Sequence, residues 1–490
     1  MKIRDGRLRP CVHPKTELLA FGAQRRLLLM QKNLLLGRLG RFVMASVLEA
    51  AKRVAVTACA LTHTTDRAAR RLGVAAFLPK LFVDRFTHLG GFTDAQFRDQ
   101  LAACRTFEDA QWASHWQGLA DEQLARADQA LRRLGGPSAE QLADPEGVVD
   151  IGALGELLGP AVTILADRGA VADPDAVVKF SSQHPEFADA AEALDALIKA
   201  LVYEFAAAWP GFSPHRLRAY KRMDRMTEVL MTALAPAMGC TVDVVQIPSG
   251  GEDVVRGYLV LPQGAKQAPT VLITNGLEGT IAEVLLPMLA QRDGNLGLFV
   301  MEMPGTYGYS APLTVAGAQT AYTKVIDYLV AEPRVDADRI GMFGASFGAY
   351  WSTRMAAVDD RLKAVVSNGP PADRSFGTLS SVGMPEIMVW TLLNTLGAKN
   401  PIDLLNKLSD FALTELCSKI SAQLLVINGA RDTLVDTQDS IDIAAAAPDA
   451  LLALYAGDDH CAMGNAEHWS PLAARFLRDH LSGPIAEPAR

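Results

Sequence analysis

A serine between two glycines is the first group in this sequence with a context for covalent chemistry. The segment GASFG at 344–348 follows a predicted strand at 339–343 and precedes a predicted helix at 347–358. Such glycines allow a sharp turn from strand to helix that leaves the serine strained and exposed, with the next N–H aimed at a developing oxyanion. The pattern predicts Ser346 as a nucleophile and the Phe347 N–H as an oxyanion donor. An ordinary glycine-rich turn is the competing interpretation.

A serine hydroxyl is a poor nucleophile at neutral pH and needs a base that is itself held by an acid. Asp432 comes just after the predicted strand QLLVI, and His460 comes just after the predicted strand LLALYA. We therefore predict Asp432 as the acid and His460 as the base, with Asp436 and His468 as the open alternatives. The order Ser, Asp, His along the chain is that of α/β-hydrolases.

The loop TNGLEGT at 274–280 is predicted to supply the second oxyanion donor, the N–H of Leu277. Glu278 has two open interpretations. Its carboxyl either is protonated or faces a substrate hydroxyl or carbonyl, or it is a favourable charge near a helix N-terminus. Thr280 and Glu283 have the spacing of a capping box for the helix that follows.

The segment EMPGTYG at 302–308 ends the next predicted strand. Glu302 is predicted to be structural. Tyr307 is predicted to bind substrate together with Glu278.

These residues require a sheet whose strand ends meet. β-branched runs begin at 241, 254 and 270, and strands then alternate with helices expected at 316–331, 347–358 and 468–481. This order predicts a mostly parallel sheet with an antiparallel edge and helices on both faces, the α/β-hydrolase fold. Residues 372–420 interrupt the alternation with helical sequence, where an insertion could form the wall of a substrate cavity.

The sequence before residue 236 has apolar residues at helical spacing and few strand signals. We expect it to be all-helical, with one helix at 42–63, long helices within 93–134, and further helices at 187–208 and 215–235. The predicted domains are a basic helical arm at 1–85, a helical cap at 86–235 and an α/β-hydrolase catalytic domain at 236–490.

A family resemblance rests on several of these motifs together. A helical N-terminal part followed by GLEGTxxE, EMPGTYGYS, GASFG, GARD and DDHC resembles the α/β-hydrolases that include fermentation-respiration switch esterases and 2,6-dihydroxypseudooxynicotine hydrolase, a carbon-carbon bond hydrolase. The resemblance covers about 90–485, including the WASHW segment with Trp112 and Trp116. It implies the triad Ser346, Asp432 and His460, and it matches Glu278 to a loop acid linked to carbon-carbon cleavage. Two features depart from the family pattern. In GLEGT a glycine follows the acid, where a serine is more usual, and the basic arm has no counterpart.

Composition excludes several other classes of protein. The 490 residues are 49 % hydrophobic and 21 % charged, and they contain no run of 18 uncharged apolar residues, so we expect neither disorder nor a membrane span. The six cysteines form no C-x-x-C pair and no Cys/His cluster at zinc spacing. Cys461, beside the predicted base, is expected to pack. We expect a cytoplasmic protein without metal or cofactor.

Charge is unevenly distributed along the chain. Residues 1–85 contain 17 basic and 5 acidic residues, a balance of +12, whereas the whole chain has a formal charge of −8, which leaves −20 for the remainder. We expect this arm to dock on the acidic body of its own or a partner subunit, giving a homodimer through the N-terminal region. Anionic lipid and nucleic acid are the alternatives, and we expect neither nucleic-acid binding nor stable membrane insertion.

Taken together, the sequence predicts a serine hydrolase that forms an acyl-enzyme and cleaves an ester or a carbon-carbon bond of a small, partly apolar carbonyl compound. An acyltransferase or thioesterase with the same triad is the alternative. A catalytically silent binding or regulatory protein on the same scaffold is the alternative from a different class.

Overall fold

The computed structural model describes residues 16–21, 51–79, 81–166, 173–249, 253–291, 295–377 and 383–481. Most of the basic arm predicted at 1–85, including residues 42–50 of its expected helix, lies outside the described residues; residues 51–61 are helical as predicted. No helix among the described residues is long and apolar enough to cross a membrane.

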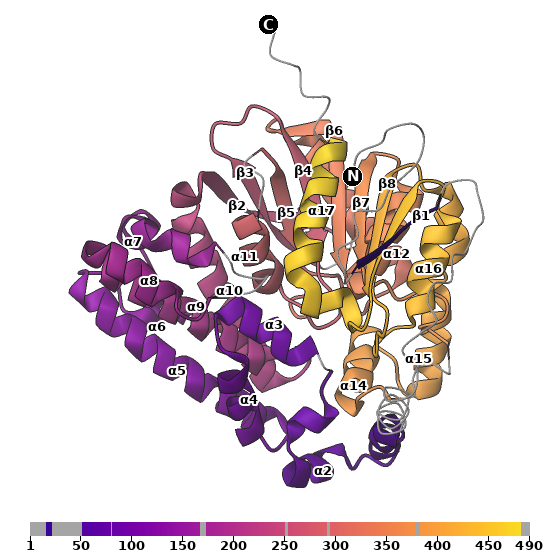
Figure 1. The fold of residues 1–490 in the computed structure, drawn as a ribbon, viewed down its shortest axis with the longest axis horizontal. Coiled ribbons are helices and arrows are strands. Elements are labelled where there is room, and N and C mark those ends of the chain that lie inside the picture. Colours follow the sequence, from indigo (N-terminus) through magenta and orange to yellow (C-terminus); the bar gives the residue numbers. More distant parts are fainter. Residues whose placement is uncertain are drawn as a thin grey trace, which may run out of the picture.

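A nine-stranded sheet forms the centre of the C-terminal part (Figure 1). In sheet order the strands are β1 (Thr16–Phe21), β9 (Ala450–Tyr455), β8 (Gln423–Gly429), β7 (Leu362–Asn368), β6 (Val335–Ala345), β4 (Ala268–Thr274), β5 (Gly297–Met301), β3 (Val254–Pro262) and β2 (Cys240–Pro248). The run from β9 to β5 is parallel, and β3, β2 and β1 are antiparallel to their neighbours. The predicted mostly parallel sheet with an antiparallel edge is confirmed.

Helices cover both faces of this sheet, which explains why every residue of β4 and β5 is buried. On one face α11 (Ile281–Gln291) packs against α17 (Ala466–Leu481). On the other face lie α12 (Val315–Ala331), α13 (Phe347–Val358) and α16 (Thr437–Ala446) (Figure 1). After β7 come α14 (Glu386–Thr395) and α15 (Pro401–Leu408), inside the insertion predicted at 372–420.

The N-terminal part forms a separate helical unit beside the sheet (Figure 1). Its helices are α2 (Thr65–Leu72), α3 (Leu81–Gly90), α4 (Asp94–Ala103), α5 (Asp109–Arg133), α6 (Ala139–Ala143), α7 (Ile151–Leu158), α8 (Ala176–Gln183), α9 (Ala188–Ala208) and α10 (Pro214–Leu234). The alanine-rich α9 lies between α5 and α10 and is buried along most of its length. Trp112 and Trp116 of α5 are fully buried in this unit.

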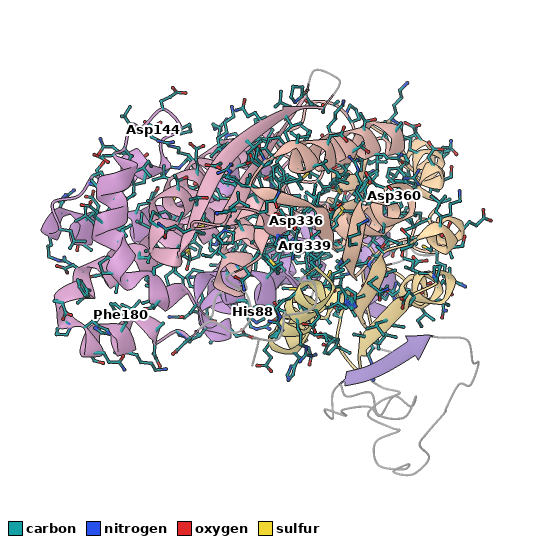
Figure 2. The ribbon with its side chains drawn as sticks, turned by 90° about the horizontal axis from the view of Figure 1, so that it is seen from above. His88, Asp144, Phe180, Asp336, Arg339 and Asp360 are labelled. Atoms are coloured by element: carbon teal, nitrogen blue, oxygen red, sulfur yellow. The ribbon has the colours of Figure 1, made fainter. Side chains whose placement is uncertain are left out.

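Helix α3 joins the helical unit to the sheet. Phe82 packs within the aromatic core of the unit, with its ring centroid 5.0 Å from that of Trp209. The same helix contacts α11 and the segment His460–Asn465. In Figure 2, His88 of α3 lies where the two parts meet, whereas Asp144 and Phe180 lie on the far side of the helical unit.

Two expectations for the N-terminal part need correction. The prediction that everything before residue 236 is helical is wrong, because β1 pairs in antiparallel register with β9, Thr16 opposite Tyr455. A six-residue strand is specified by hydrogen bonds to an edge more than 400 residues away, and no local pattern encodes that pairing. The predicted domain boundary between 85 and 86 falls inside α3, a continuous helix.

Candidate active site

Ser346 lies at the sharp turn between β6 and α13. Its φ of 57° and ψ of −125° place a non-glycine residue in a left-handed region that L side chains rarely adopt. A Cβ on Gly344 would approach the Gly348 carbonyl oxygen to 2.0 Å, and one on Gly348 would approach the Asn275 carbonyl oxygen to 2.2 Å. Both glycines are therefore required by close backbone contact, as the sequence motif implies.

The structure brings Ser346, His460 and Asp432 into one line of hydrogen bonds. His460 Nε2 lies 2.8 Å from Ser346 Oγ, and His460 Nδ1 lies 2.7 Å from Asp432 Oδ2. The alternatives do not join this line. Asp436 caps α16 by accepting a hydrogen bond from the Gln438 N–H, and His468 lies in α17 beside Glu467.

The acid and base are held in fixed orientations. Asp432 Oδ1 accepts hydrogen bonds from the Leu434 and Val435 N–H groups at 2.8 and 2.9 Å. Burial lowers the pKa of His460, but Asp432 and Cys461 together outweigh burial and raise that pKa well above its usual value. Their combined effect favours the protonated imidazole.

Sequence reasoning missed Asn428, which connects the two loops that carry the acid and the base. Its side-chain amide donates to Asp432 Oδ2 at 3.0 Å, and its Oδ1 accepts from the Cys461 N–H at 3.1 Å. Asp459 reinforces the connection by accepting a hydrogen bond from the Thr433 N–H. Asn428 is a polar residue that follows the apolar run LLVI of strand β8, four positions before Asp432, and this is the signal that could have pointed to it. Cys461 is buried, as predicted, with its thiol 3.3 Å from the Asn368 carbonyl oxygen.

The loop predicted to hold the oxyanion lies directly against the serine. A Cβ on Gly276 would come within 2.7 Å of Ser346 Cβ, so only glycine fits there. Leu277 and Phe347 are buried next to Ser346, and both line the larger of the two cavities described below. Their positions are compatible with the predicted oxyanion role, which stays a prediction.

Glu278 is buried beside the triad and is held by a residue that the sequence did not single out. Arg85 Nη1 donates to Glu278 Oε1 at 3.2 Å, and the same guanidinium binds both carboxylate oxygens of Glu283. Burial raises the pKa of Glu278, while Arg85 acts in the opposite direction. No local signal marks Arg85, since it lies 193 residues from Glu278 in the chain.

The predicted capping box of Thr280 and Glu283 is wrong. Glu283 turns toward Arg85, and the Thr280 hydroxyl is buried without a hydrogen-bond partner among the described residues. The ion pair with the buried Arg85 guanidinium holds the Glu283 side chain away from the position that a capping box requires.

Glu302 and Tyr307 lie behind the loop that carries Glu278. The Tyr307 hydroxyl donates to the Glu278 carbonyl oxygen at 2.7 Å, and its ring stacks on Tyr220. Tyr307 does not line either cavity at Ser346, so its geometry favours positioning of Glu278 over the substrate binding predicted for it. Glu302 accepts a hydrogen bond from the Tyr220 hydroxyl at 2.9 Å, which fits the predicted structural role.

Burial raises the pKa of Glu302 to about 8. The folded state therefore holds a proton on this group between about pH 5 and pH 8 that the unfolded chain releases, and the free energy of unfolding should fall with rising pH by up to about 1.4 kcal/mol per pH unit in that window. Glu302→Gln should remove this slope. Urea unfolding of both proteins at pH 5, 6.5 and 8 checks the expectation, and equal pH dependence of the two would contradict it.

Two cavities open on Ser346 and His460. The larger has a volume of about 440 Å³ and the smaller about 110 Å³, and both are lined by Leu277, Glu278, Ser346 and His460. The insertion supplies much of the larger cavity's wall, as predicted for residues 372–420. Among the described residues of the cap predicted at 86–235, only His88 and Leu89 of α3 line either cavity.

Part of this chain is similar to a known family. Residues 177–415, just under half of the chain, match a family model described as Esterase FrsA-like. The matched region contains Ser346 and the loop that carries Glu278, whereas Asp432 and His460 follow it in the chain.

Curated relatives match parts of the chain. Esterase FrsA of Vibrio cholerae is 31 % identical over 155 residues, which cover 30 % of this chain and 36 % of the relative. The 2,6-dihydropseudooxynicotine hydrolase of Paenarthrobacter nicotinovorans is 28 % identical over 125 residues, covering 25 % of this chain and 34 % of the relative. The chain thus spans about a third of the length of these two relatives.

A solved structure shows the same fold over a longer stretch. The crystal structure of the 2,6-dihydroxy-pseudo-oxynicotine hydrolase superposes with a TM-score of 0.56 and 18 % identity, covering 81 % of this chain and 95 % of that one. The chain has the α/β-hydrolase fold preceded by a helical N-terminal part.

Proposed function

We propose that this protein is a serine hydrolase. The observation that carries the proposal is the line of hydrogen bonds from Ser346 through His460 to Asp432, which opens on two cavities. FrsA-like relatives named esterases and hydrolases support the same reaction class.

The proposed reaction has two half-reactions. Ser346 Oγ attacks the substrate carbonyl carbon while His460 takes its proton, and the Leu277 and Phe347 N–H groups hold the oxyanion. His460 then returns the proton to the leaving group, and an acyl-Ser346 ester remains. Water, activated by His460, adds to that ester and releases the acid product together with the free serine.

Covalent labelling tests the nucleophile directly. A fluorophosphonate probe should add one phosphonyl group to Ser346, detected by mass spectrometry of the peptide that contains it. Ser346→Ala protein is the matched control and should not react. Failure of the folded wild-type protein to react with the probe, while a known serine hydrolase reacts in the same tube, would overturn the proposal.

The bond that is cleaved is an ester or a carbon-carbon bond. The role of Glu278 distinguishes these two reactions. Expelling a carbanion-like or enolate group requires its charge to be stabilised or protonated, whereas His460 alone can protonate an alkoxide. Glu278 is 6 % exposed, burial raises its pKa, and its side chain lines both cavities beside Ser346. When this carboxyl carries its proton, it can donate that proton to a departing enolate.

Glu278→Gln should therefore affect the two substrate classes unequally. The change keeps the side chain's shape and its contact with Arg85 but removes the titratable proton. Ester turnover should stay within about tenfold of wild type, and cleavage of a β-diketone should fall by roughly 10² to 10⁴. Glu302→Gln is the control, because that carboxyl is also buried but lines neither cavity. Equal small losses on both classes would make Glu278 a structural charge and the protein an esterase.

A further inference from the structure

The two cavities at Ser346 differ in size. At about 440 Å³ the larger is within the range of sites that enclose a drug-sized molecule. At about 110 Å³ the smaller is below the roughly 150 Å³ of a cavity that holds benzene. A substrate whose carbonyl carbon reaches Ser346 therefore has one bulky side and one small side.

The larger cavity is walled mainly by apolar side chains of the insertion. Those on α14 and α15 include Met388, Val389, Leu392, Leu393, Leu404 and Leu405. Its charged residues include Glu386, which accepts a hydrogen bond from the exposed His63 ring, so this pair lies toward solvent. The wall of this cavity therefore favours a hydrocarbon group.

The smaller cavity also has many apolar wall residues, but it differs from the larger one in its polar groups. Four buried polar atoms of residues that line only the smaller cavity have no hydrogen-bond partner among the described residues: His88 Nδ1, Asn275 Nδ2 and both polar side-chain atoms of Asn368. Asn275 and Asn368 are each 1 % exposed. Buried polar atoms are paired in most proteins, so a group of them around one cavity indicates a polar ligand that donates and accepts hydrogen bonds.

The order of the two half-reactions indicates which cavity holds the leaving group and which holds the acyl chain. Water must take the place of the leaving group before the acyl-enzyme can be hydrolysed. A cavity lined with unpaired polar atoms holds water, whereas an apolar cavity stays dry. The leaving group therefore departs from the small cavity, and the acyl chain stays in the large one.

We propose that the substrate joins a bulky apolar acyl group, bound in the large cavity, to a small uncharged leaving group with a hydroxyl or carbonyl, bound by Asn368 and Asn275 in the small cavity. This inference rests on the serine hydrolase function proposed above. Arg85 is matched by the carboxylate of Glu283, so the described residues that line the small cavity include no unpaired lysine or arginine for an anionic leaving group.

Isosteric esters test the leaving-group side. 2-Hydroxyethyl octanoate and propyl octanoate differ by a hydroxyl in place of a methyl group. A site built to hydrogen-bond a hydroxyl rejects the analogue that lacks it, so kcat/KM for the hydroxyethyl ester should exceed that for the propyl ester by about tenfold or more. In Asn368→Ala the ratio should fall toward one. Because the ratio is measured within each variant, a general loss of activity does not affect it.

The length of the acyl chain tests the assignment of the large cavity. Wild-type kcat/KM should be at least tenfold higher for 2-hydroxyethyl octanoate than for 2-hydroxyethyl acetate. Leu393→Trp, which fills part of the large cavity, should reduce that preference and leave the hydroxyethyl-to-propyl ratio unchanged. Asn368→Ala should do the reverse, so each variant is the control for the other.

The outcomes separate the inference from the function on which it rests. Ester turnover with neither preference, or a Leu393→Trp protein that changes only the leaving-group ratio, would overturn the cavity assignment and leave the hydrolase intact. No turnover and no fluorophosphonate labelling would overturn both. Calorimetry on Ser346→Ala protein should show the same preference for the hydroxyethyl over the propyl ester in Kd, and equal Kd values would count against the assignment whatever the turnover.

Discussion

Ser346→Ala is expected to lower kcat on any substrate of this protein by about 10⁵-fold or more, because the variant has no oxygen with which to form the acyl-enzyme. The fold should be unaffected. Alanine keeps the Cβ, so it occupies the left-handed conformation at φ 57° with the same strain as serine. Steady-state kinetics together with thermal unfolding check both halves of this expectation. Undiminished turnover in pure, folded Ser346→Ala protein would refute the nucleophile assignment.

His460→Ala should be about as damaging as Ser346→Ala, and the double variant should be little worse than either single variant. The reason is that Ser346 and His460 are hydrogen-bonded and act as a unit, so removing the second member costs nothing more once the first is gone. Additive losses would indicate two independent contributions in place of a shared mechanism.

His468→Ala is the matched control for this second prediction. It removes a histidine only eight positions further along the chain, on α17, outside both cavities at Ser346. Its kcat should stay within a few-fold of wild type. A loss as large as that of His460→Ala would mean that the base had been assigned to the wrong histidine.

The sequence by itself predicted the elements that carry the site. The predicted helices at 347–358 and 316–331 match α13 and α12 within one residue at either end. Such elements follow from local rules, since apolar runs of strand length alternate with amphipathic helices. The same rules place Asp432 and His460 after parallel strands β8 and β9, whose carboxyl ends necessarily lie at one edge of the sheet.

Only the tertiary structure decided which partners these residues have. β1 is a strand because the edge of β9 supplies its hydrogen bonds, and Glu283 leaves its predicted cap because Arg85 of α3 reaches it from 198 residues away. The cavities were decided in the same way, since segments near residues 60, 85, 277 and 390 meet at one serine only after the chain has folded. Packing between segments so distant in sequence depends on contacts that leave no periodicity in either segment, and a reading of local patterns therefore cannot detect them.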